Sequence, residues 1–169
     1  FFPAKTMGSH VTNWNKNTSV KFRTDVCSSC KLGFDIDLKS LSEDDYKFVQ
    51  QAVKNYNSMK PVILEGDQYR LVSPYEGSHC AVNYVSKDKQ RAVLFAYDLH
   101  PRYKEPQMNV KLQGLNPAKV YTVKETNLMP GKTSELECDG KQFSGDYLMK
   151  IGLNVFTAQD GTSHVLVLE

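Results

Sequence analysis

Two aspartates separated by one residue, Asp35 and Asp37, have the spacing of a catalytic carboxylate pair. On a β-strand such residues point to the same side, and in a shared pocket one carboxyl group can act as acid and the other as base. Asp37 also stands close before a predicted helix, where turn or capping roles are the more common use of aspartate. We therefore keep Asp35 as a candidate site residue and interpret Asp37 as a solvated turn or capping residue.

The cysteines offer a second possible chemistry. Cys27 and Cys30 form a CxxC motif, whereas Cys80 and Cys138 stand far apart. A redox CxxC lies at the start of a helix that follows a strand, and a zinc site needs further ligands at a suitable spacing. Here the motif falls late in a predicted helix and no second CxxC follows. We interpret the pair as small helix-face residues and expect neither a metal nor a cofactor.

Charge and hydropathy narrow the range of partners. The 169 residues include 21 Lys and Arg against 19 Asp and Glu, for a net charge of +2. This interspersed balance argues against nucleic acid as a partner. No apolar run approaches the roughly 20 residues that cross a bilayer, so no membrane partner is expected. The chain starts on Phe1 rather than Met, which we interpret as the start of a fragment. Its compartment, cytoplasmic or exported, stays open.

The first sixty residues predict strands that alternate with helices. An apolar start predicts a strand at residues 1–7, before a polar loop at 8–17. Thr18 or Ser19 can cap a helix at about 19–31, and a second short strand follows at 32–36. Ser42-Glu43-Asp44-Asp45 is a capping box that starts a helix at 42–57, which we expect Pro61 to end. This β/α order requires further strands, because two such units cannot close a sheet.

Beyond Gly66 the sequence predicts many short strands and no helix. Residues 79–99 form two β-rich runs joined by a polar link at 86–90, which is typical of an antiparallel hairpin. The unbroken apolar run at 92–97 indicates a central strand that is covered on both faces. Strands are predicted near residues 69–73, 79–86, 91–99, 108–113, 120–125, 135–139, 147–150 and 164–169. Their spacing is typical of an antiparallel β-sandwich.

Five segments carry a resemblance to a known family. They are MGSHVT at 7–12, LGFDIDL at 32–38, LSEDD at 41–45, GDQYRL at 66–71 and FSGDYLM at 143–149. In this order and spacing they resemble the C-terminal part of glycoside hydrolase family 36 α-galactosidases (melibiases). The resemblance implies a mixed fold. Residues 1–60 would be the last quarter of a catalytic (β/α)8 barrel, with strands seven and eight at 1–7 and 32–36, and residues 61–169 a C-terminal antiparallel β-sandwich.

The resemblance also implies an activity. The family hydrolyses terminal α-galactosides such as melibiose and raffinose with retention, using two aspartates whose carboxyl groups lie about 5 Å apart. In the family these aspartates end strands four and six, before the part that this chain resembles, so the chain alone is expected to be inactive. Its implied partners are the rest of the barrel and an α-galactoside, and the resemblance also implies a homo-oligomeric parent enzyme.

The barrel interpretation defines four candidate substrate-binding residues. In a (β/α)8 barrel the active face is formed at the carboxyl ends of the strands. Met7, Gly8 and His10, placed after strand seven, and Asp35, at the end of strand eight, are therefore expected at the sugar pocket. His10 can donate to a sugar hydroxyl or bond to backbone, and both alternatives stay open. Gly8 suits backbone geometry better than ligand contact.

An alternative from another functional class is a stand-alone carbohydrate-binding or oligomerisation module. In that case Tyr97, Tyr103 and Tyr121 would form an aromatic platform for sugar rings, although aromatic residues in β-sandwiches mostly pack in the core. Trp14 can likewise stack on a sugar or anchor packing. The module leaves the N-terminal β/α segment without a purpose, so the enzyme fragment is the preferred interpretation.

Overall fold

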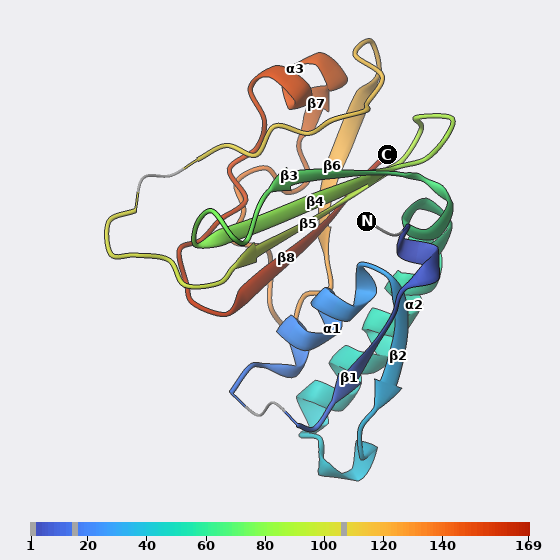
Figure 1. Cartoon of the computed structure of the whole chain (residues 1–169), viewed down its shortest axis with the longest axis vertical. Helices are drawn as coiled ribbons and strands as arrows, with labels where there is room; N and C mark the ends of the chain where they lie inside the picture. Colours follow the sequence, from blue (N-terminus) through green and yellow to red (C-terminus); the bar gives the residue numbers. More distant parts are fainter. Residues whose placement is uncertain (1–2, 15–16, 106–107) are drawn as a thin grey trace.

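The computed structural model describes residues 3–14, 17–105 and 108–169 and contains two sheets. A two-stranded parallel sheet lies on one side of the helices α1 (Val20–Ser28) and α2 (Glu43–Glu65), and a six-stranded antiparallel sheet lies on the other (Figure 1). Among the described residues, no helix combines the length and the apolar character that crossing a membrane requires.

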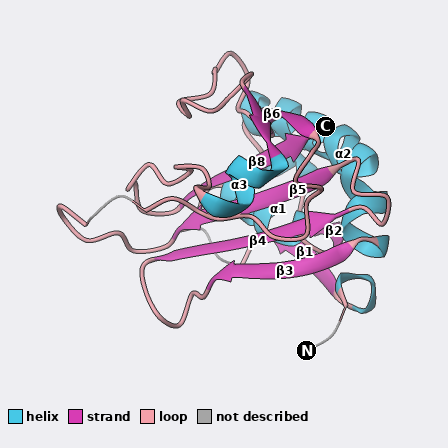
Figure 2. Ribbon diagram, turned by 90° about the horizontal axis from the view of Figure 1, so that it is seen from above, coloured by secondary structure: helices cyan, strands magenta, loops and turns pink. Residues whose placement is uncertain are grey.

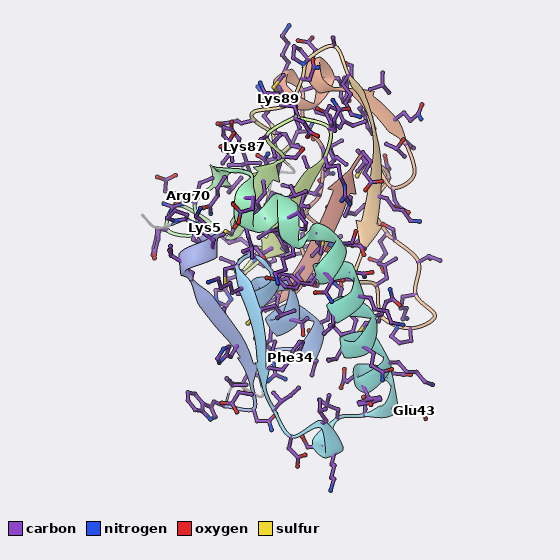
Figure 3. All side chains as sticks on the ribbon, turned by 90° about the vertical axis from the view of Figure 1, so that its right-hand side faces the viewer. Lys5, Phe34, Glu43, Arg70, Lys87 and Lys89 are labelled. Carbon is purple, nitrogen blue, oxygen red and sulfur yellow. The ribbon has the colours of Figure 1, made fainter. Side chains whose placement is uncertain are left out.

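The first unit alternates short strands with helices. Its elements are η1 (Ala4–Thr6), β1 (Gly8–Thr12), α1 (Val20–Ser28), β2 (Lys31–Asp35), η2 (Leu38–Ser40) and α2 (Glu43–Glu65). The side chain of Ser19 accepts from the amide of Phe22 and caps α1. Ser42 accepts from the amide of Asp45 and caps α2, as the capping box predicts. Figure 3 shows Glu43 at the start of α2, far from Lys87 and Lys89.

The first strand lies further along the chain than the sequence predicts. The expected strand at 1–7 is wrong over its described part, because Pro3 and Ala4 accept backbone bonds that close the 3-10 turn η1. Residues 1–2 lie outside the described residues. Gly8–Thr12, predicted as loop, instead forms β1, which pairs with β2. Side chains alternate along this strand, so that Val11 is buried while the neighbouring His10 points to the opposite face.

Helix α2 is longer than predicted, since it continues through Pro61 to Glu65. The prediction that Pro61 ends the helix is wrong. A proline inside a helix costs about 3 kcal/mol. Val62 and Ile63, the next two residues, are buried against the six-stranded sheet. Burial of such side chains contributes about 1.5–3 kcal/mol each, which is enough to offset the proline.

The second unit is the six-stranded sheet, in the order β3-β4-β5-β8-β6-β7. Its strands are β3 (Asp67–Val72), β4 (His79–Val85), β5 (Ala92–Asp98), β6 (Val120–Thr126), β7 (Gln142–Ser144) and β8 (Thr162–Leu168). The β4–β5 hairpin is confirmed, with His79 opposite Asp98 and Val85 opposite Ala92. Every residue of β5 is buried between β4 and β8, as the apolar run predicts.

Three predicted strands are absent from the described residues. Residues 108–113 contribute only an isolated bridge between Val110 and Leu153, and residues 135–139 form an irregular segment followed by a turn. Residues 147–150 belong to the helix α3 (Gly145–Lys150), so the expectation of no helix beyond Gly66 is also wrong. This helix forms because the side chain of Ser144 accepts from the amide of Tyr147 at its first turn.

Both faces of the six-stranded sheet are covered (Figure 2). One face packs on α1 and α2, where Tyr56, Met59 and Ile63 meet aromatic residues of β4 and β5. The other face is covered by α3 and by the loops at 110–115, 136–138 and 153–156. The sheet with its loop layer fits a β-sandwich.

Candidate functional site

The candidate site is the face of the β1–β2 pair that is turned away from the helices. The strands run parallel in a register that places Gly8 beside Lys31, His10 beside Gly33 and Thr12 beside Asp35. Because side chains alternate along a strand, these six residues share one face. The opposite face is directed to the helices, with Phe34 packed on the apolar cluster of α1 and α2. The outward face is therefore polar, and the inward face is apolar except for Ser9.

His10 lies across Gly33 in the middle of this face. A Cβ atom at position 33 would overlap Cδ2 of the His10 ring, so the glycine makes room for the imidazole. The side chain of His10 forms no hydrogen bond to any other described residue. These contacts therefore do not support the alternative in which the His10 side chain is bonded to backbone. Its role as a sugar ligand stays a prediction.

The shift of β1 changes where the other candidate residues lie. Met7 and Gly8 stand at the amino end of β1, not in a loop beyond its carboxyl end, and His10 is within the strand. This part of the prediction is wrong because the strand begins at Gly8 instead of ending before it. Asp35 ends β2, as predicted, and lies beside Thr12. Contact of Met7, Gly8, His10 and Asp35 with a sugar stays a prediction.

The carboxyl ends of β1 and β2 bring together residues that the sequence alone did not connect. Thr12 was missed, although alternation from His10 places it on the same face. Its carbonyl oxygen accepts a hydrogen bond from Arg23 of α1. Asp37 accepts from the amide of Lys39 and caps η2, which confirms its capping role. The nearby Trp14 side chain is 88% exposed.

A buried cluster on the loop-covered face of the six-stranded sheet also contains titratable groups. Nδ1 of His164 lies 2.6 Å from Oε1 of Glu125, and Ser134 donates to the other carboxylate oxygen. Burial acts to raise the pKa of Glu125, but the bonds with His164 and Ser134 outweigh it and hold the pKa below its ordinary value. Sequence spacing gives no signal for a pair that far apart in the chain.

Thr157 extends this cluster without completing a nucleophilic site. Its hydroxyl lies 3.4 Å from Nε2 of His164, which has the order of a hydroxyl, imidazole and carboxylate triad. However, both the amide and the hydroxyl of Thr157 lie within hydrogen-bond distance of Oδ2 of the buried Asp98, at 2.9 and 3.2 Å. Oδ1 of Asp98 lies 2.7 Å from Nδ1 of His79. These bonds through Asp98 connect the loop around Thr157 to the end of β5, which is a structural role.

The cysteines do not have the environment of reactive thiols. Cys27 and Cys30 are buried, and burial raises the pKa of both thiols. A redox-active cysteine needs the opposite shift. Sγ of Cys27 instead accepts a hydrogen bond from Ser9 of β1 at 3.1 Å. Across the described ranges, no group of three or more His, Cys, Asp or Glu side chains is placed to hold a metal ion.

Comparisons with known proteins give one consistent picture. Residues 79–168 match the family described as the glycosyl hydrolase family 36 C-terminal domain. α-Galactosidase 1 of Pediococcus pentosaceus is 30% identical over 171 residues, covering 97% of this chain and 21% of that protein. α-Galactosidase 2 of Hypocrea jecorina is 29% identical over 175 residues, covering 99% of this chain and 21% of that protein. The chain thus spans about a fifth of the length of these relatives.

Solved structures extend the similarity to the fold. The family 36 α-galactosidase AgaB from Geobacillus stearothermophilus superimposes with a TM-score of 0.83 at 26% identity, covering 99% of this chain and 22% of that chain. A variant of AgaA from the same organism, crystallised with raffinose, gives a TM-score of 0.84 at 25% identity, covering 99% of this chain and 22% of that chain.

Proposed function

Because the chain belongs to the glycosyl hydrolase family 36 C-terminal domain family, we propose that it is the carboxyl-terminal part of a retaining α-galactosidase. The proposed substrates are sugars with a terminal α-galactosyl group, of the melibiose and raffinose type. The relatives that cover nearly the whole chain are α-galactosidases, and a similar enzyme was crystallised with raffinose.

The observation that carries the proposal is the half-covered parallel pair β1–β2. Parallel strands occur in sheets whose faces are both covered and which have more than two strands. Here α1 and α2 cover one face only, and among the described residues neither strand has a second neighbour. In the proposed enzyme, β1-α1-β2-α2 forms the last two units of a (β/α)8 barrel, and the other strands pair with the open edges.

The polar face of the pair then lines the substrate side of the barrel. Active sites of such barrels lie at the carboxyl ends of the strands. We assign Thr12 and Asp35 to that end and His10 to the wall below it, whereas Met7 and Gly8 lie at the opposite end. The nucleophile and the acid–base carboxyl group, about 5 Å apart in a retaining enzyme, come from strands outside this chain. The six-stranded sheet braces the barrel through α1 and α2.

An activity assay tests this proposal. The complete protein that contains this chain is expected to hydrolyse an aryl α-galactoside and to release the α-anomer of galactose first, as retention requires. The chain alone is expected to release no aryl group. Hydrolysis by the chain alone, or an inactive complete protein, would overturn the proposal. Assembly of the complete enzyme into homo-oligomers stays a prediction.

One observation favours sugar binding by the sheet domain as a second candidate. Tyr75 and Tyr103 are 96% and 90% exposed, on loops that meet where Ser78 accepts backbone bonds from Leu99 and His100. Exposed aromatic rings are suitable stacking surfaces for sugars. The predicted platform is otherwise wrong, because Tyr97 and Tyr121 are buried core residues. A galactoside titration in which Tyr75→Ala abolishes binding would support this candidate, and no binding by the unmodified chain would exclude it.

A further inference from the structure

Asp25 of α1 is a carboxylate enclosed completely between the helices and the six-stranded sheet. Its Oδ2 atom accepts from Nζ of Lys21 at 2.7 Å and from the hydroxyl of Ser163 on β8 at 2.7 Å. Its Oδ1 atom accepts from the side-chain amide of Asn127, just after β6, at 2.8 Å. The backbone oxygen of Asp25 accepts from the hydroxyl of Tyr97 on β5 at 3.1 Å. One residue of α1 is therefore bonded to three parts of the sheet.

The same network includes the second helix. Asn127 accepts from the side-chain amide of Asn55 on α2 at 2.8 Å. Nζ of Lys21 also donates to the backbone oxygen of Ser163 at 2.6 Å. Both helices are thus connected to the sheet through Asp25 and its direct partners.

On the side facing the parallel pair, α1 is bonded to β1. Arg23 donates to the carbonyl oxygen of Thr12 at the carboxyl end of the strand, and Cys27 accepts from Ser9 nearer its start. Figure 1 shows α1 between the two sheets. A continuous path of hydrogen bonds and one helix therefore leads from β8 through Asp25 to Thr12.

Stability alone is a weak explanation for this cluster. Removing two charges from water is expensive, and well-packed apolar residues often stabilise a buried site as well or better. Directional bonds from several elements do something that apolar contacts do not: they favour one docking geometry. The structure places this directional cluster where the sheet meets the helix that holds β1.

We propose that Asp25 is a positioning residue of the enzyme, which acts through α1 and Arg23 to fix the carboxyl end of β1 in the substrate face. This inference rests on the proposed α-galactosidase function. Asp25 does not contact substrate. It sets where Thr12 lies relative to the catalytic carboxylates supplied by the rest of the barrel.

The test uses the complete enzyme and a matched pair of substitutions. Asp25→Asn keeps the shape of the side chain and removes its charge. Glu125→Gln makes the same change at a carboxylate that is also buried, on the other face of the sheet, and that is hydrogen-bonded to His164 and Ser134 rather than to a residue of α1. Both variants are expected to melt at lower temperature than the unmodified enzyme, which controls for a general loss of stability.

Kinetics at a temperature where both variants are folded separate positioning from stability. For an aryl α-galactoside, Asp25→Asn is expected to raise KM about tenfold with kcat changed much less, because a displaced wall weakens binding of ground state and transition state alike. Glu125→Gln is expected to leave KM within about twofold. Equal KM values in the two variants would overturn the inference, whereas an inactive unmodified enzyme would instead overturn the proposed function.

A second set of variants keeps the inference testable if Asp25→Asn does not fold. Ser163→Ala removes one donor to Asp25 while leaving every residue of α1 unchanged, and it is expected to raise KM by a smaller factor than Asp25→Asn. Arg23→Met is expected to raise KM as well, and Arg23→Lys, which retains a donor, to restore part of it. Hydrogen exchange of residues 8–12 should speed up in each KM-raising variant and not in Glu125→Gln. Unchanged exchange there would contradict the proposed path.

Discussion

The two faces of the six-stranded sheet are equally well buried, but they support different parts of the molecule. On β5, Phe95 and Tyr97 are directed toward α1 and α2, whereas Leu94 and Ala96 are directed toward α3 and its loops. The helix-covered face is richer in aromatic side chains, which bury more area per residue. One face holds a separate β/α unit, and the other completes the sheet's own domain.

The buried carboxylates Asp25 and Glu125, one on each face of the sheet, have pKa values shifted in opposite directions. Asp25, on the helix-covered face, has its pKa raised, because burial outweighs the opposing effect of Lys21. Glu125, on the other face, has its pKa lowered, because bonds with His164 and Ser134 outweigh burial. The environment between the helices and the sheet thus disfavours the ionised form of Asp25, whereas the loop-covered face favours the ionised form of Glu125. This contrast is what the following substitutions examine.

Truncating Phe95 should have the largest effect on stability. Phe95→Ala is expected to lower the free energy of unfolding by about 3–5 kcal/mol, because the ring is fully buried and its removal leaves a cavity in the core. Leu94→Ala is the control on the other face, with an expected loss of about 2–5 kcal/mol. Urea denaturation measures both. Hydrogen exchange should show α2 opening more readily in Phe95→Ala, and equal exchange of α2 in both variants would contradict the division between the faces.

Replacing Glu125 should change how stability responds to acid. A carboxyl group whose pKa is lower in the folded state than its ordinary 4.5 stabilises the fold above that value, and the contribution disappears as the pH falls through the folded pKa. Glu125→Gln should therefore flatten the acid side of a stability profile followed by urea midpoints from neutral pH to about pH 3. A profile as steep as that of the unmodified protein would mean that other groups control the acid response.

Replacing Asp25 should act with the opposite sign. Its folded pKa lies above the ordinary 3.8, so the contribution of this group is most favourable at low pH and is lost as the pH rises through the folded pKa. In the same urea experiment, Asp25→Asn should remove the loss of stability that accompanies ionisation of Asp25 as the pH rises. The stability of the variant relative to the unmodified protein should consequently rise with pH, whereas that of Glu125→Gln should fall. Differences of the same sign would refute the contrast between the two carboxylates.

The sequence predicts elements well where a local pattern coincides with their final environment. The apolar run of β5, the polar turn before it and the cap at Ser42 are such cases, and all are confirmed. Prediction fails where burial elsewhere overrides the local signal. Pro61 lies inside α2 because Val62 and Ile63 pack on the sheet, and α3 is too short to show a helical period.

The candidate site was less predictable, because it depends on register and on contacts between distant residues. Asp35 was placed at the correct strand end, but the displaced β1 put His10 within a strand and moved Met7 and Gly8 to its other end. The bonds of Asp25 to Asn127 and Ser163 join residues more than a hundred positions apart, which no spacing in the sequence can indicate.

Substituting Gly33 should have the smallest effect, because it touches neither face of the six-stranded sheet. An added Cβ would displace only the exposed ring of His10, so Gly33→Ala is expected to lower the free energy of unfolding by less than about 1 kcal/mol. Gly66→Ala is the matched control. There the Cβ would meet the backbone oxygens of Val62 and Val85, where α2 joins β3, and a loss of about 1–3 kcal/mol is expected. Urea denaturation measures both variants. If Gly33→Ala destabilises the protein as much as Gly66→Ala, the His10 ring cannot move aside. The outward face of β1–β2 would then be as tightly packed as the covered faces of the six-stranded sheet, and the contrast between them would not hold.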